Sequence, residues 1–140
     1  MKFSYFKFLL DKRSDFFGSS ILKPIIPIQI TVDDLSVRYD ALIDSGADFC
    51  IFDASLGESL GLDIRSGTEI AFGGIQQRGG ATAYLHHLQI AVGGHGYTTI
   101  VGFSFDIATH GYGILGQKGF FDMFLVKFDL IKEEIELKPR

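Results

Sequence analysis

Apolar residues along this chain fall into short stretches that are separated by glycines and polar turn residues. The clearest alternation covers residues 124–130, where every second side chain is apolar and Lys127 and Asp129 point to the opposite face. Comparable stretches predict further strands at 25–32, 39–43, 69–72, 82–92, 97–105 and 135–137. The first ten residues, MKFSYFKFLL, are also predicted as a strand, because Ser4 and Lys7 interrupt the apolar run that a signal peptide would need.

Only two segments have a helical pattern. Residues 54–60 predict a short helix that Gly61 can close, and Gln117 to Met123 predict a second one. Both are too short to serve as the crossover between parallel strands of an α/β sheet, so the sequence predicts a mainly β fold. No internal repeat, low-complexity tract or linker divides the chain, and we therefore expect a single domain over residues 1–140.

The composition narrows the range of functions. With 46% hydrophobic residues and no apolar run of the roughly 18 residues that cross a bilayer, the chain is predicted to be soluble and to have no membrane partner. Its net charge of −4 argues against nucleic acid as a partner. Cys50 is the only cysteine, which excludes an internal disulfide and suits a reducing compartment, so we expect a cytoplasmic protein.

Three stretches suggest chemistry but have simpler explanations. Residues 111–116 match G-x-G-x-x-G, yet a dinucleotide site needs a βαβ unit around that motif, and none is predicted. His86 and His87 could suggest a metal site, but neighbours on a strand point to opposite faces, which favours surface or packing roles. Cys50 could be a nucleophile only with a base beside it in the fold, so a small buried residue is the favoured interpretation.

The most informative stretch is ALIDSGAD, residues 41–48, in which three apolar residues lead into a carboxylate. Burying an unpaired carboxylate is costly, so either Asp44 opens a turn or its charge is needed at that position. A D-S-G turn alone is common, because Asp and Ser bond to nearby backbone groups and Gly accepts a positive φ. A second signal follows downstream, where two apolar residues, Ile114 and Leu115, precede Gly116.

Together these stretches resemble the retroviral-type (retropepsin-like) aspartic proteases, which include single-domain members from bacteria. Residues 41–48 are similar to the family's hydrophobic-hydrophobic-D-[ST]-G-A active-site motif, and residues 114–116 to its second hydrophobic-hydrophobic-Gly element. Between them lies a stretch similar to the tip of the flap, the hairpin that covers the site in this family: Phe72, Gly73, Gly74 and Ile75. The resemblance extends from about residue 25 to residue 137.

The resemblance implies an all-β acid protease fold, with a mostly antiparallel closed sheet, a flap hairpin and one or two short helices. It also implies an aspartic endopeptidase that cleaves peptide or protein substrates as a two-fold homodimer, without a cofactor or a metal. Asp44 would be the catalytic residue and would activate a water together with its symmetry mate. The remaining expected site residues are Ser45, Gly46 and Ala47 as support of the active-site loop, residues 72–75 as the flap, and Ile114, Leu115 and Gly116 as the second loop.

Departures from the family pattern keep an alternative open, namely a non-catalytic module that retains the fold for dimerisation or peptide binding. Arginine is frequent after the second glycine, where it supports the acid that follows the active-site alanine. This chain has Gln117 there, with Lys118 as a candidate substitute for the support of Asp48. The flap is also longer and more polar over residues 76–80.

The sequence also suggests where a dimer would form. Unpaired apolar strand edges invite pairing with another chain. Residues 3–10 and 135–137 are therefore the candidate strands of a dimer interface.

Overall fold

The fold is known from a computed structural model, which describes residues 1–73, 80–107 and 111–140. Almost every element is a strand, and among these residues no helix is long and apolar enough to cross a membrane. In chain order the elements are β1 (Lys2–Ser4), β2 (Phe6–Ser14), β3 (Gly18–Lys23), β4 (Ile25–Val32), β5 (Leu35–Ile43), β6 (Ile51–Asp53), α1 (Ala54–Ser59), a 3-10 turn η1 (Ile64–Ser66), β7 (Thr68–Phe72), β8 (Ala81–Val92), β9 (His95–Ser104), β10 (Gly113–Leu115), β11 (Phe124–Asp129) and β12 (Glu134–Pro139).

Most of the strands belong to one closed sheet. Its strands follow one another in the order β4, β5, β10, β6, β9 and β8, and β8 pairs back to β4. Neighbouring strands are antiparallel, except that β5 and β10 are parallel, as are β6 and β9. β7 extends the sheet by pairing with the first residues of β8. This closed, mostly antiparallel sheet confirms the all-β fold class that the sequence predicts.

The inward-facing side chains of the closed sheet form the core. In β4 the isoleucines at 26, 28 and 30 are buried while Gln29 between them is exposed, as strand alternation requires. Phe52 of β6 and Phe103 of β9 are fully buried, with ring centroids 6.1 Å apart. Helix α1 packs closely on this pair, since a Cβ on Gly57 would lie only 2.9 Å from the Phe103 ring.

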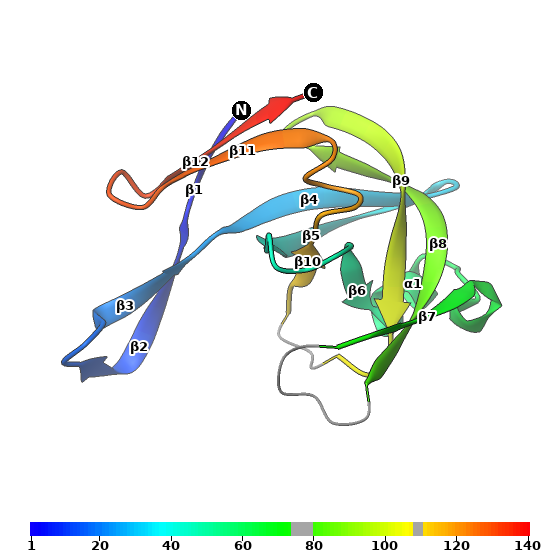
Figure 1. Ribbon diagram of the computed structural model, residues 1–140, viewed down its shortest axis with the longest axis horizontal. Coiled ribbons are helices and arrows are strands. Elements are labelled where there is room, and N and C mark those ends of the chain that lie inside the picture. Colours follow the sequence, from blue (N-terminus) through cyan, green and yellow to red (C-terminus); the bar gives the residue numbers. More distant parts are fainter. Residues whose placement is uncertain (74–79, 108–110) are drawn as a thin grey trace.

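The two ends of the chain lie side by side in a separate three-stranded sheet (Figure 1). Its order is β1-β12-β11, and Ile135 and Leu137 of the central strand are buried. Over residues 134–136 both edges of β12 are paired within the chain. Leu137 is also bonded on both sides, since it exchanges two hydrogen bonds of 2.8 Å with Met1 and pairs with Val126. The expectation that residues 135–137 offer an open edge to a second copy is therefore wrong, and the outer edges of this sheet belong to β1 and β11.

A long hairpin projects from the body of the molecule, by which we mean the closed sheet and the three-stranded sheet (Figure 1). The sequence suggests only the first strand of this hairpin. The predicted N-terminal strand is divided at Tyr5, whose N–H donates to the Glu133 carbonyl at 3.0 Å. After this anchor the chain turns away into β2 and returns in β3, and the two strands pair only with each other. Gly18 adopts a φ of +79° at the start of β3, a conformation that glycine reaches without strain.

The helix predicted for Gln117 to Met123 is wrong, because these residues form a series of turns. Gly119 has a φ of +98°, which a right-handed helix does not allow. The N–H of Phe121 bonds to the Gly116 carbonyl, a span of five residues instead of the four of an α-helix. The Tyr97 hydroxyl donates to the Gly119 carbonyl at 2.9 Å and holds the turns in place, and burial raises the pKa of this tyrosine.

The other predicted helix is present as α1. Asp53 caps its first turn, since its carboxylate accepts a hydrogen bond from the Ser55 N–H at 2.9 Å. Gly61, with a φ of +84°, follows Leu60 at the end of the helix as expected.

A substitution in the core tests this account of packing. Phe103→Ala would remove a fully buried ring that contacts both β6 and α1, so we expect a loss of about 3–5 kcal/mol in the free energy of unfolding. Phe128→Ala is the matched control, because that ring is 42% exposed, and it should cost about 1 kcal/mol or less. Urea unfolding at one fixed protein concentration measures both, and equal losses would show that the sheet interior is not the main core.

Candidate active site

Asp44 lies directly after the last residue of β5. This strand is paired with β4 along one edge and with β10 along the other, so the chain that leads to Asp44 is held on both sides. Asp44 is half-buried, and its N–H donates to the Leu115 carbonyl at 3.0 Å. The end of β10 thus fixes the backbone of the carboxylate that the sequence singles out.

The D-S-G segment forms a tight turn around its own carboxylate. Oδ1 of Asp44 accepts a hydrogen bond from the Gly46 N–H at 2.9 Å, and the Ala47 N–H bonds to the Asp44 carbonyl at 3.2 Å. A Cβ on Gly46 would lie 3.2 Å from Oδ1, so glycine leaves that oxygen room. Oδ2 makes no hydrogen bond to any residue that the structure describes, which leaves it available for a water or a second carboxyl group.

The second predicted motif lies alongside the first. The three residues of β10 pair in parallel register with the last three of β5. Gly116 follows at once and packs on the active-site loop, where a Cβ would strike the Phe49 carbonyl and lie 2.7 Å from the Ala47 carbonyl. Glycine at this position therefore lets the two loops approach each other.

Gln117 joins the two loops at the position where the resemblance leads one to expect arginine. Its Nε2 donates to the Ser45 carbonyl at 2.6 Å, and its backbone N–H donates to the Ala47 carbonyl at 2.8 Å. Lys118 supports Asp48 through the backbone, since its N–H donates to the Asp48 carbonyl at 3.0 Å. Within the described ranges no ion pair joins the side chains of Lys118 and Asp48.

A cleft of about 370 Å³ opens beside Asp44. One wall is the active-site loop from Asp44 to Phe49, and the other is the end of β7. Phe49 and Phe72 meet edge to face across it, with ring centroids 6.0 Å apart, so an aromatic contact connects the loop to the β7–β8 hairpin. The arrangement combines a fixed carboxylate with apolar walls, as in many small-molecule and peptide sites.

The structure brings most of the predicted site residues to this cleft. Its lining includes Asp44, Gly46, Ala47, Phe72, Gly73 and Ile114, whereas Gly74 and Ile75 lie outside the described residues. Ser45, Leu115 and Gly116 belong to the supporting loops. The sequence does not single out the apolar wall residues Phe49, Ile51 and Ile70, because nothing in their local pattern separates them from ordinary strand residues.

The other stretches that suggested chemistry have structural roles. Cys50 is fully buried, and burial raises the pKa of its thiol to about 12. His86 is half-buried with Nε2 2.8 Å from the Ile64 carbonyl, while His87 is exposed. Residues 111–116 contain the short strand β10 and are followed by turns instead of a helix, so the described residues after the motif lack the helix of a dinucleotide site.

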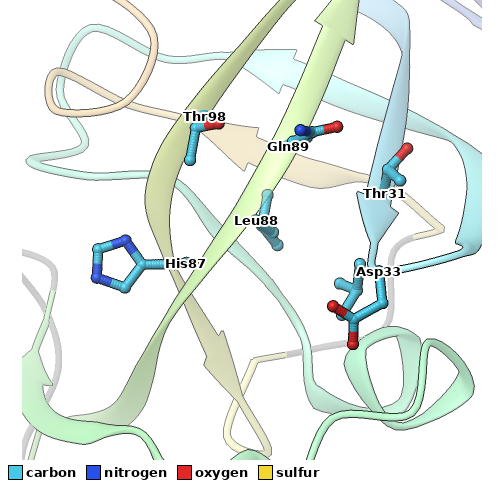
Figure 2. Close-up of a pocket in the computed structure, with 7 residues that line it drawn as sticks. Thr31, Asp33, His87, Leu88, Gln89 and Thr98 are labelled. Atoms are coloured by element: carbon cyan, nitrogen blue, oxygen red, sulfur yellow. The ribbon is translucent and has the colours of Figure 1, made fainter.

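A second hollow lies over strands β4, β8 and β9 and shares no lining residue with the Asp44 cleft. Figure 2 draws its two titratable side chains, Asp33 and His87, at opposite ends. Within the described part of the chain no group of three or more His, Cys, Asp or Glu side chains could hold a metal ion. The Asp44 cleft is the candidate active site, because among the described residues it combines both motifs with a fixed carboxylate.

The bridge that Gln117 makes between the two loops can be tested directly. Gln117→Ala would remove the hydrogen bond to the Ser45 carbonyl, which contributes about 0.5–1.5 kcal/mol. The amide of Gly46 should then exchange its hydrogen up to about tenfold faster, as measured by mass spectrometry or NMR. Gln89→Ala, an exposed glutamine far along the sheet, is the control, and an unchanged rate at Gly46 would show that Gln117 does not stabilise the loop.

The chain is similar to known proteins in sequence and in structure. Residues 28–118, more than half of the chain, match the family described as aspartyl protease. A retropepsin-like aspartic protease from Rickettsia conorii shares 13% identity with a TM-score of 0.57, over 98% of this chain and 92% of that one. The EIAV protease complexed with the inhibitor HBY-793 shares 20% identity with a TM-score of 0.47, over 68% of this chain and 82% of that one.

No curated protein matches the chain significantly. The family match nevertheless spans both motifs, from β4 through Asp44 to the loop after β10. The chain therefore belongs to the aspartyl protease family and has its retropepsin-like fold.

Proposed function

We propose that this protein is an aspartic endopeptidase that works as a two-fold homodimer, with Asp44 of each copy as a catalytic residue. The observation that carries the proposal is the Asp44 carboxylate itself, fixed by β10 at a cleft and free at one oxygen among the described residues. Hydrolysis without a metal or a covalent nucleophile needs one group to take a proton and another to give one. Each chain has a single D-S-G motif, so a second copy is the natural source of the other carboxylate.

The pair of carboxylates explains the chemistry. Two carboxyl groups about 3 Å apart cannot both ionise at low cost, so they would hold one proton between them. The ionised group takes a proton from water, whose oxygen attacks the peptide carbonyl carbon, while the protonated group gives its proton to the carbonyl oxygen. The carbon–nitrogen bond then breaks as the nitrogen receives a proton from the carboxyl pair. A hydroxyl of the intermediate returns a proton to the pair, which is thereby restored.

The walls of the cleft suggest how a substrate would bind. Phe49, Ile70 and Phe72 offer apolar surface next to Asp44, which suits an extended peptide with an apolar side chain near the cleaved bond. The Ser45 hydroxyl is exposed and has no hydrogen-bond partner among the described residues of its own chain. It is thus available to bond across the two-fold axis to the loop of the second copy.

Cleavage of a diverse peptide library by the purified protein tests the proposed activity. Wild-type protein should cleave peptides, and Asp44→Ala should remove that cleavage while leaving the fold intact by circular dichroism. Asp33→Asn is a matched control, because Asp33 lies in the β4–β5 turn, outside the residues that line the Asp44 cleft. No cleavage by folded, dimeric wild-type protein would instead support the non-catalytic module.

Mixing wild-type chains with Asp44→Asn tests whether two copies share one site. The amide is close in shape to the carboxylate but cannot accept the proton, so mixed dimers should be inactive. After free exchange in an equal mixture, only about a quarter of all dimers should contain two wild-type chains. Activity should therefore fall as the square of the wild-type fraction. A linear fall at fixed total protein, once exchange is verified with tagged chains, would mean that each chain acts alone.

The state of Cys50 separates this mechanism from a thiol protease. The thiol is buried and its pKa is raised to about 12, so near pH 8 it stays protonated and inaccessible. Iodoacetamide should therefore leave peptide cleavage unchanged and should label Cys50 rapidly only after denaturation. Loss of activity in step with labelling would assign the chemistry to the thiol.

A buried, reduced cysteine also agrees with the cytoplasmic location that we propose.

A further inference from the structure

Among the described residues, no other strand of the chain pairs with the β2–β3 hairpin. The two strands form a sheet of their own, and in Figure 1 they extend away from the body of the molecule. None of the residues from 6 to 23 is fully buried. A two-stranded hairpin that stands alone in water is marginally stable at best, so an ordered hairpin of this length calls for a surface to pack on.

Several apolar side chains of this hairpin are exposed. Leu9 is 78% exposed and Phe16 is 87% exposed, and Phe6 and Phe17 are exposed as well. Phe16 and Phe17 stack edge to face at the tip, with ring centroids 4.8 Å apart. Aromatic side chains gathered on one projecting element are typical of a protein–protein contact.

The base of the hairpin contacts the first motif and the residue that precedes β10. Directly after β3, the Pro24 carbonyl accepts a hydrogen bond from the N–H of Ile43, the residue before Asp44. Lys23 at the end of β3 places its ammonium 5.9 Å from the ring centre of Tyr112, the residue before β10. The hairpin therefore leaves the body beside the loop at which the second Asp44 would have to arrive.

The charge of the hairpin complements the rest of the chain. Residues 6–23 hold four basic side chains (Lys7, Lys12, Arg13 and Lys23) and two acidic ones (Asp11 and Asp15). Because the whole chain has a net charge of −4, the remaining residues carry a net charge of −6. Lys7 already pairs with Glu133 of its own chain at 3.6 Å, whereas Lys12 and Arg13 form no ion pair among the described residues. These two side chains can therefore attract the acidic surface of a second copy.

We infer that the β2–β3 hairpin is a dimerisation arm that packs on the body of a second copy of this chain. The inference rests on the homodimer of the proposed function and adds the element that holds it together. In a two-fold dimer each chain gives one arm and receives one, so the apolar side chains of both hairpins are covered at once. The arms would lie on either side of the paired Asp44 loops.

The first test weakens the arm without touching the body. Leu9→Ser combined with Phe16→Ser changes only strongly exposed side chains, so the monomer should fold as before. Sedimentation equilibrium should show a dimer dissociation constant raised about tenfold or more, as expected when two apolar anchors of an interface are lost. Leu35→Ser is the matched control, because Leu35 is also exposed, at 51%, but is the first residue of β5 and lies outside the hairpin.

The second test uses the wild-type protein. Hydrogen exchange at the amides of β2 and β3 should slow as the protein concentration rises through the dimer dissociation constant. An unchanged dissociation constant in the double variant, or a hairpin that still exchanges fast in the dimer, would overturn the inference. So would a chain that stays monomeric while its hairpin binds a different protein or a lipid vesicle.

Peptide cleavage, measured separately, distinguishes this inference from the proposed function. Arm-dependent dimers that cleave no peptide would retire the protease proposal and keep the arm. Asp44-dependent cleavage with an unchanged dissociation constant in the double variant would retire the arm and keep the protease proposal.

Discussion

Without the parallel pairing of β5 with β10, neither loop of the candidate active site would have a defined position. The pairing sets Ile43 beside Leu115, and the N–H of Asp44 then reaches the Leu115 carbonyl. Parallel strands cannot be joined by a tight turn, so all the elements from β6 to β9 lie in the connection between them. The site can therefore form only together with most of the closed sheet, which is the expected behaviour of long-range β pairing.

The end of an apolar strand is a suitable place for this carboxylate. Asp44 is only half-buried, with one oxygen bonded to the Gly46 N–H and the other facing no described hydrogen-bond donor. The strand gives the carboxylate a fixed position. Because the carboxylate lies at the cleft, it avoids the unfavourable desolvation free energy of full burial. Glycines at 46 and 116 complete the arrangement, because any side chain there would crowd the carboxylate or the neighbouring loop.

Two features of the molecule fit the homodimer that we propose. One is the lone D-S-G carboxylate, and the other is a hairpin without a fully buried residue. The hydrogen bond between the Ile43 N–H and the Pro24 carbonyl places the base of the hairpin next to the Asp44 loop. A two-fold axis close to Asp44 would complete both, because symmetry supplies the second carboxylate and a second body together.

The sequence by itself determined the features that depend on neighbours in the chain. Alternation over residues 124–130 and the Gly-bounded pattern around α1 predicted those elements, and the two short motifs pointed to Asp44. Local pattern failed at residues 117–123, where Gly119 and the Tyr97 hydroxyl favour turns over a helix. It also gave no sign of the return strand β3.

Only the tertiary structure decided which distant residues meet. Phe49 faces Phe72 across the cleft, and Gln117 reaches the Ser45 carbonyl, because the closed sheet brings their strands together. Contacts of this kind depend on strand order and register, which arise from packing of the whole core. The sequence could therefore name the catalytic candidate, whereas the walls of its cleft and the support of its loop needed the fold.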